Sequence, residues 1–111
     1  MPNLESVKRD ILVECEEDHV GLWSVIREVE DAFPDSDTAD IRNRVLQLVH
    51  ELLAAHMIQA GFPSPGGRGF RPLRMAPDQI VHRIEEEWPV DRRPKIGEGV
   101  WFTRAKKANH R

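Results

Sequence analysis

The chain lacks tyrosine, has a single cysteine among its 111 residues, and contains no long apolar run. Because one cysteine cannot close an internal disulfide, Cys15 excludes a disulfide-stapled fold and favours a cytoplasmic protein. No stretch approaches the roughly 18 apolar residues that span a bilayer. Residues 1–10 also lack the apolar segment of a secretion signal. We therefore expect a cytoplasmic protein with no membrane partner.

Motifs that mark an enzyme, a metal site or a cofactor site are also missing. Cys15 lies on an apolar helix stripe without an adjacent base, and no serine stands in a nucleophile elbow of the G-x-S-x-G type. The glycine-rich segment 63–69 lacks the lysine–serine/threonine pair of a phosphate-binding loop. His82 has Glu85 three residues later, but such a lone pair is common on solvated helices. The sequence predicts a non-enzymatic protein without metal or cofactor.

Charge of one sign dominates each part of the chain, although the net charge is only −3. Residues 1–40 carry twelve acidic and three basic residues, whereas residues 41–111 carry seven acidic and thirteen basic residues. Such a bipolar distribution can orient the domain against a charged partner, or two copies of the chain against each other as a homodimer. It is equally consistent with two solvated surfaces.

Four segments have the spacing of apolar residues that predicts amphipathic helices. They cover residues 3–17, 21–33, 38–56 and 77–88. Asp37 or Thr38 can cap the third helix, and Pro34 ends the second because proline disfavours helix in the preceding residue. The stripes of the first three helices predict one core that includes Ile11, Ile26, Val45, Leu48, Val49 and Leu52.

Four segments with β-prone or turn-forming residues complete a single domain over residues 1–104. Residues 57–62 predict a strand, residues 63–69 a mobile glycine-rich loop, and residues 69–75 a returning strand. Residues 98–104 predict a final strand that pairs with this hairpin, in which alternation buries either Trp101 or the pair Val100 and Phe102. We expect residues 105–111 to form a basic, disordered tail.

Three helices, a strand, a glycine-rich loop and a returning strand follow one another over about residues 4–75, with the helix-to-strand transition ELLAAHMIQAG. This order resembles the winged helix-turn-helix superfamily, although no individual family is identified. The resemblance implies an α+β, mainly helical fold with a three-helix core and a β-hairpin wing. This chain adds a helix and a C-terminal strand to that arrangement.

The same resemblance implies DNA binding through the third helix and the wing. Polar side chains that point away from the helix core would read base edges, and arginines of the wing would contact phosphates or the minor groove. The candidate DNA-binding residues are Asn43, Arg44, Gln47, His50, Arg68, Arg71 and Arg74. Against this function stand Asp35, Asp37 and Asp40 at the start of that helix and a sequence pI of about 5.9.

Protein recognition is the alternative function. The acidic N-terminal part can meet a basic partner, as a small acidic inhibitor or immunity-type protein does when it blocks a basic nuclease. Trp23 is a candidate anchor because tryptophan is enriched at binding hot spots. The candidate protein-binding residues are Glu14, Glu16, Glu17, Asp18 and Trp23. One contiguous positive face containing the third helix and the wing would favour DNA, whereas a large acidic face would favour a protein partner.

Overall fold

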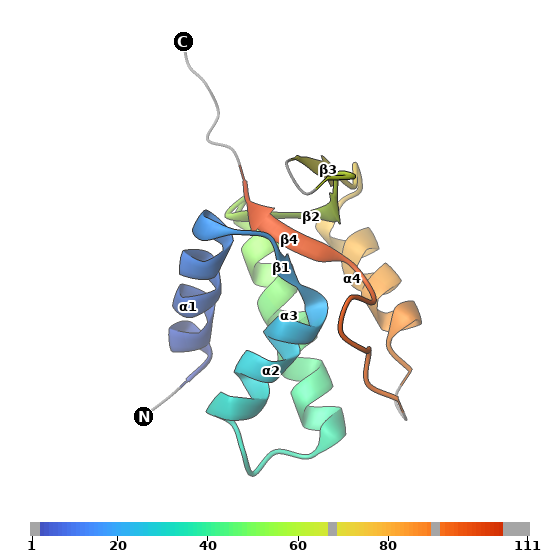
Figure 1. Ribbon diagram of the computed structural model, residues 1–111. Helices are drawn as coiled ribbons and strands as arrows, with labels where there is room; N and C mark the ends of the chain where they lie inside the picture. Colours follow the sequence, from blue (N-terminus) through green and yellow to red (C-terminus); the bar gives the residue numbers. More distant parts are fainter. Residues whose placement is uncertain (1–2, 67–68, 90–91, 106–111) are drawn as a thin grey trace.

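The computed structural model describes residues 3–66, 69–89 and 92–105 (Figure 1). These residues form an α+β domain with four helices and a four-stranded antiparallel sheet. In chain order the elements are α1 (Leu4–Glu17), β1 (Val20–Gly21), α2 (Leu22–Ala32), α3 (Thr38–Ala54), β2 (Ile58–Pro63), β3 (Phe70–Pro72), α4 (Pro77–Glu87) and β4 (Trp101–Arg104).

Local capping interactions set the starts of the helices. The Asn3 side chain accepts a hydrogen bond of 2.9 Å from the Ser6 N–H at the start of α1. Asp37 accepts one of 2.8 Å from the Asp40 N–H at the start of α3. Both contacts satisfy backbone donors that the first turn of a helix leaves unpaired. Pro77 begins α4, at the position where its missing N–H costs nothing.

The last strand of the chain lies inside the sheet rather than at its edge. The strand order is β1-β4-β2-β3, and every neighbouring pair is antiparallel. In β4, Phe102 pairs with Val20 of β1 on one side and with Ala60 of β2 on the other. The predicted final strand and its pairing with the hairpin are therefore confirmed. It begins only at Trp101, because Gly97 and Gly99 turn the chain just before it with φ angles of +89° and +83°.

The helices cover one face of the sheet. In Figure 1 the sheet lies above the helices, with α1 and α4 on opposite sides of α2 and α3. Val100 and Phe102 are fully buried against this layer, whereas Trp101 is half-buried. Of the two alternatives that strand alternation left open, the structure has the one that buries Val100 and Phe102. The Trp101 ring instead contacts Trp23 edge-on, with the ring centroids 4.6 Å apart.

The predicted core is confirmed, since every residue named for it is at most 2% exposed. Leu46 is an additional buried residue on α3, and the spacing analysis left it out because the place of α4 beside α3 was unknown. Cys15 is buried as well. Burial raises the pKa of its thiol to about 12, so this side chain packs as a small apolar group.

The sheet differs from the prediction at its two edges. Strand β1 was not expected, because two residues carry no periodic pattern and Val20–Gly21 depends on β4 for its pairing. Strand β3 covers three residues rather than 69–75, since Pro72 lacks the N–H that a longer ladder needs. The Ser64 N–H donates to the Gly69 carbonyl at 2.8 Å and closes the hairpin. Residues 67–68, and all of the predicted tail except Ala105, lie outside the described residues.

Candidate recognition surfaces

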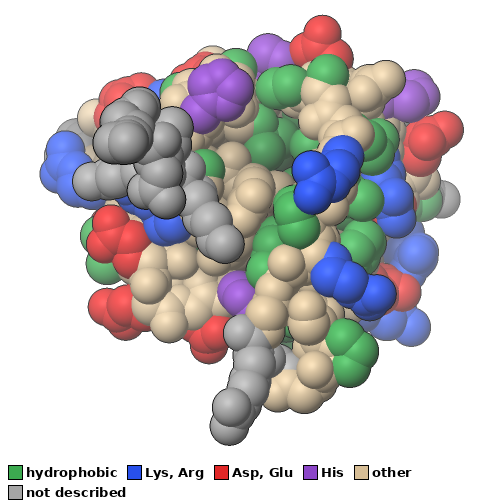
Figure 2. Space-filling model, turned by 90° about the horizontal axis from the view of Figure 1, so that it is seen from above, with side chains coloured by type: hydrophobic (Ala, Val, Ile, Leu, Met, Phe, Trp, Pro, Cys, Tyr) green, Lys and Arg blue, Asp and Glu red, His purple; other side chains and the backbone are tan. Residues whose placement is uncertain are grey.

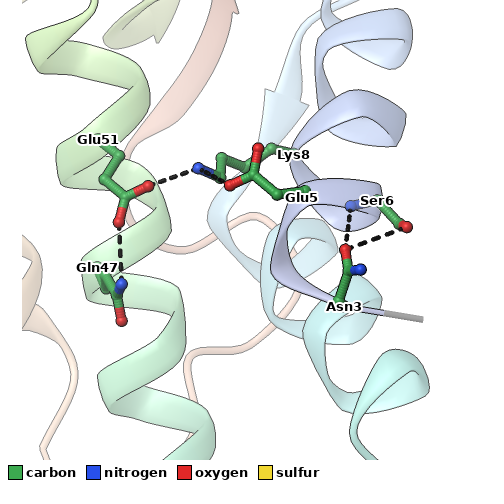
Figure 3. A network of polar contacts seen from close by, with 6 residues as sticks. All are labelled: Asn3, Glu5, Ser6, Lys8, Gln47 and Glu51. Carbon is green, nitrogen blue, oxygen red and sulfur yellow. Dashed lines mark hydrogen bonds and ion pairs between the residues drawn. The ribbon is translucent and has the colours of Figure 1, made fainter. Parts of the chain in front are cut away.

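The outward face of α3 carries two exposed amide side chains, those of Asn43 and Gln47, as predicted. Gln47 donates a hydrogen bond of 2.9 Å to Glu51, and Glu51 in turn accepts from Lys8 of α1 (Figure 3). Lys8 also lies 2.6 Å from Glu5. These contacts raise the pKa of Lys8 and lower that of Glu51, so both groups stay charged and held together. Gln47 is thus part of a polar network between α1 and α3.

Arg44 is also engaged within the domain. Its Nε donates to Asp40 at 3.1 Å, one turn earlier on α3. Its guanidinium lies 4.0 Å from the centroid of the Phe33 ring at the end of α2. Hydrogen bonds from the Ser36 hydroxyl and from Arg44 hold the pKa of Asp40 below its usual range. A phosphate that approached Arg44 would therefore meet a carboxylate beside it.

Helix α4 packs on the side of α3 that is opposite to α1 (Figure 1). The Nε2 atom of His50, predicted to point away from the core, lies 2.6 Å from Asp78 in the first turn of α4. Arg42 donates from Nε to the Trp88 carbonyl at 3.0 Å and from an Nη atom to the Glu85 carbonyl at 3.2 Å. The sequence predicted α4 but not its place, so the half-burial of His50 and its acidic neighbour were missed.

The hairpin arginines have different surroundings. Arg71 and Arg74 are exposed, and neither is in an ion pair with another residue of the described segments. Arg68, the third arginine predicted for this site, lies outside the described residues. In the view from above the sheet, basic and acidic side chains both occur, with hydrophobic side chains between them (Figure 2). The visible part of this face is therefore mixed in charge.

A second surface lies where α1, β1 and α2 meet, and we call it the acidic hollow. It has a volume of about 290 Å³. Its lining comprises Glu14, Glu17, Asp18, His19, Val20, Gly21, Trp23 and Ser24. The structure thus brings together four of the five residues predicted for protein recognition. Glu16 is the exception, because its side chain turns to Arg104 of β4 at 3.5 Å.

A tight connection between α1 and α2 shapes the acidic hollow. The Asp18 N–H donates to the Glu14 carbonyl at 3.0 Å and ends α1, and α2 begins directly after Gly21. A Cβ atom at Gly21 would fall 1.8 Å from a carbon of the Trp23 ring. Only glycine therefore lets this indole lie over β1, where it also meets the edge of Trp101. The Trp23 indole, which forms one wall of the hollow, is therefore held between Gly21 and the Trp101 ring.

Carboxylates crowd together beside the hollow. The carboxyl group of Glu28 on α2 is hydrogen-bonded to that of Glu14 on α1, and partial burial and the charges of Asp10 and Asp31 add to this effect. Together these causes raise the pKa of Glu28 to about 7. None of these four side chains is in an ion pair with a cation of the described segments. The helix spacing of Asp10 with Glu14 and of Glu28 with Asp31 is the signal that could have identified the cluster.

The described residues hold no group of three or more His, Cys, Asp and Glu side chains placed to bind a metal ion. Among the helices described, none has the length and apolar character needed to cross a membrane. Comparison of the chain with family models, with curated proteins and with solved structures found no match.

Proposed function

We propose that this protein is a non-enzymatic recognition domain that binds a basic segment of a protein partner in the acidic hollow. The observation that carries the proposal is the convergence of Glu14, Glu17 and Asp18 around the fixed indole of Trp23. A concave surface with an aromatic wall and several carboxylates fits the side chain of lysine or arginine. The charge of that side chain meets the carboxylates, and its apolar stem lies on the indole.

The neighbouring cluster strengthens this argument. Glu14 lies in the hollow and also contacts Glu28, so the two surfaces share one field of negative charge. Like charges held close together repel, and a bound cation relieves that repulsion as it forms its own contacts. A basic partner is thereby favoured over a neutral or acidic one, and its approach is steered from a distance.

DNA recognition by a winged-helix arrangement is the second candidate function. It is supported by the element order from α1 to β3, by the exposure of Asn43 and Gln47, and by Arg71 and Arg74 on the hairpin. The pairing of Arg44 with Asp40 counts against it, because phosphate contacts would have to displace a carboxylate. Protein recognition is therefore the function that the geometry supports better.

Fluorescence anisotropy with two labelled probes separates the two functions. One probe is an arginine- and lysine-rich peptide, and the other is a random-sequence DNA duplex, each titrated at low and moderate salt. We expect the wild-type protein to bind the peptide, and the variant Glu17→Gln/Asp18→Asn to bind it about tenfold more weakly or worse, because charged hydrogen bonds are lost. The matched control Glu85→Gln/Glu86→Gln removes the same charge from α4 and should leave peptide binding unchanged.

Two results would contradict the proposal. If the protein does not bind the peptide at low salt, the acidic hollow is not a site for basic segments. If both double variants lose the same affinity, peptide binding depends only on the net charge of the protein and not on the hollow. Duplex binding that weakens with Arg71→Gln/Arg74→Gln and flattens in its salt dependence would put DNA recognition in its place.

A further inference from the structure

A second hollow lies on the other side of Trp23, between α2 and the segment that leads into β4, and we call it the basic hollow. It has a volume of about 510 Å³. In Figure 1 the start of α2 lies between α1 and this segment. The charged residues of the basic hollow are all cations, whereas three carboxylates line the acidic hollow, and Trp23 lines both. The lining of the basic hollow comprises Trp23, Arg27, Arg93, Pro94, Lys95 and Ile96.

Two cations of the basic hollow are unmatched within the part of the domain that the structure describes. Arg27 and Lys95 are exposed, and neither forms an ion pair with another described residue. Arg93, in contrast, pairs with Glu30 at 3.0 Å. A cation that has no partner gives up no contact when a carboxylate arrives, so Arg27 and Lys95 favour an acidic partner.

The turn of residues 95–98 presents an apolar side chain beside these cations. The Glu98 N–H donates to the Lys95 carbonyl at 2.9 Å, and Gly97 has the positive φ, +89°, that the third position of such a turn needs. The Glu98 carboxylate also accepts a hydrogen bond of 2.8 Å from the Lys95 N–H. Ile96 is therefore held at the tip of a closed turn, and it is 83% exposed. Small and polar residues normally occupy such positions, so an isoleucine fixed there offers a preformed apolar contact.

An interface between two identical copies that are related by a two-fold axis needs a surface that complements itself, because the same residues of both copies meet there. The two hollows satisfy this requirement, since they lie next to each other and have opposite charge. A two-fold axis that passes near Trp23 places the basic hollow of each copy on the acidic hollow of the other. Opposite charges then face each other twice within one interface.

We propose that the acidic hollow binds the turn of residues 95–98 from a second copy of this chain, which makes the protein a two-fold symmetric homodimer. The proposal rests on the function proposed above and names the partner, because the basic segment comes from the protein itself. Lys95 of each copy pairs with the carboxylates around Asp18 of the other copy. Ile96 lies against the Trp23 indole of that other copy, so charge and apolar contact act together.

The test is sedimentation velocity of the full-length protein over a range of concentrations, at low and at moderate salt. We expect a reversible dimer that salt weakens, because salt screens charge pairs near the surface. Lys95→Glu and Asp18→Lys should each weaken the dimer about tenfold or more, since each substitution places like charges against each other. The double variant Lys95→Glu/Asp18→Lys exchanges the two charges and should restore dimerisation. Arg74→Glu is the matched control, because it makes the same change of charge at an exposed hairpin position and should leave the dimer unchanged.

Binding of the basic peptide separates a failure of this proposal from a failure of the proposed function. Lys95→Glu frees the acidic hollow of the second copy, so this variant should bind the peptide at least as tightly as the wild type does. A wild-type protein that binds the peptide but stays monomeric would overturn the homodimer and leave the proposed function intact. A dimer that both single variants leave unchanged, or that the double variant does not restore, would also overturn the homodimer. If Lys95→Glu does not bind the peptide, both proposals fail.

Discussion

The outward face of α3 and the corner formed by α1, β1 and α2 both carry many charged side chains, but the two surfaces arrange them differently. On α3, opposite charges are matched within the domain, as Arg44 with Asp40 and Lys8 with Glu51 show. At the corner, carboxylate meets carboxylate, and the pKa of Glu28 rises to about 7 as a result. A charge that is already paired gains little from a new partner, because it must first give up the old one. Both surfaces carry many charged side chains, and they differ in whether those charges are paired within the domain.

The largest effect is expected from removing the strand that pairs with β1 at the corner and with β2 of the hairpin. Truncation of the chain after Gly97 deletes β4, which pairs with β1 beside the acidic hollow and with β2 of the hairpin. It also removes Val100 and Phe102, both of which are 0% exposed. We expect the truncated chain to lose its cooperative thermal transition in circular dichroism. A truncated domain with native stability would mean that neither the corner nor the hairpin depends on β4.

The next largest effect is expected in the core beneath both surfaces. Leu48→Ala leaves a cavity at a fully buried position of α3 and should lower the free energy of unfolding by about 2–5 kcal/mol. Urea denaturation measures this loss. Val13→Ala is the control, because Val13 is 52% exposed and its truncation should change stability by about 0.5 kcal/mol or less. A small loss of stability in Leu48→Ala would show that the Leu48 side chain is not packed in the core between the helices.

A substitution confined to the corner should alter the corner without altering the outward face of α3. Gly21→Ala places a Cβ atom against the Trp23 ring, so the indole must move, at a cost in stability of about 1–3 kcal/mol. We expect a changed near-ultraviolet circular dichroism signal and weaker binding of the basic peptide, with the face of α3 unaffected. Ser24→Ala also alters the lining of the hollow but creates no clash, so it should retain both properties. Unaltered peptide binding in Gly21→Ala would remove Trp23 from the site.

The smallest effect concerns the pH dependence of stability. Because the pKa of Glu28 is about 7 in the folded protein and its ordinary value is 4.5, the folded state binds its proton more tightly. The free energy of unfolding should therefore fall as pH rises from about 4.5 to about 7. Glu28→Gln should remove this fall and stabilise the protein near pH 8, by about 1 kcal/mol or less since the group is partly solvated. Urea denaturation across this pH range measures the slope.

Asp35→Asn is the control for this measurement, because Asp35 is exposed and lies outside the acidic cluster. It should leave the slope unchanged. A wild-type protein whose stability is flat between pH 4.5 and 7 would mean that Glu14 and Glu28 do not share a proton.

The predictions made from sequence succeeded where local interactions decide the outcome. The apolar stripe through Val45 and Leu48 and the cap at Asp37 located α3 to within two residues. Glu14, Glu17, Asp18 and Trp23, chosen from the sequence as protein-binding candidates, lie together in one hollow, and their role in binding stays a prediction. The sequence did not predict contacts with distant elements, such as that of His50 with Asp78 of α4 and that of Glu16 with Arg104 of β4.

By itself, the sequence determined which segments are helices, which faces of them are buried, and which part of the chain is acidic. Periodicity, capping and charge act over a few residues, so they can be read along the chain. Tertiary structure alone decided that β4 lies between β1 and β2, that Glu28 lies against Glu14, and that Trp23 lines both hollows. These features depend on contacts between residues that are far apart in the chain. Helix packing and strand order bring them together, and neither leaves a local pattern.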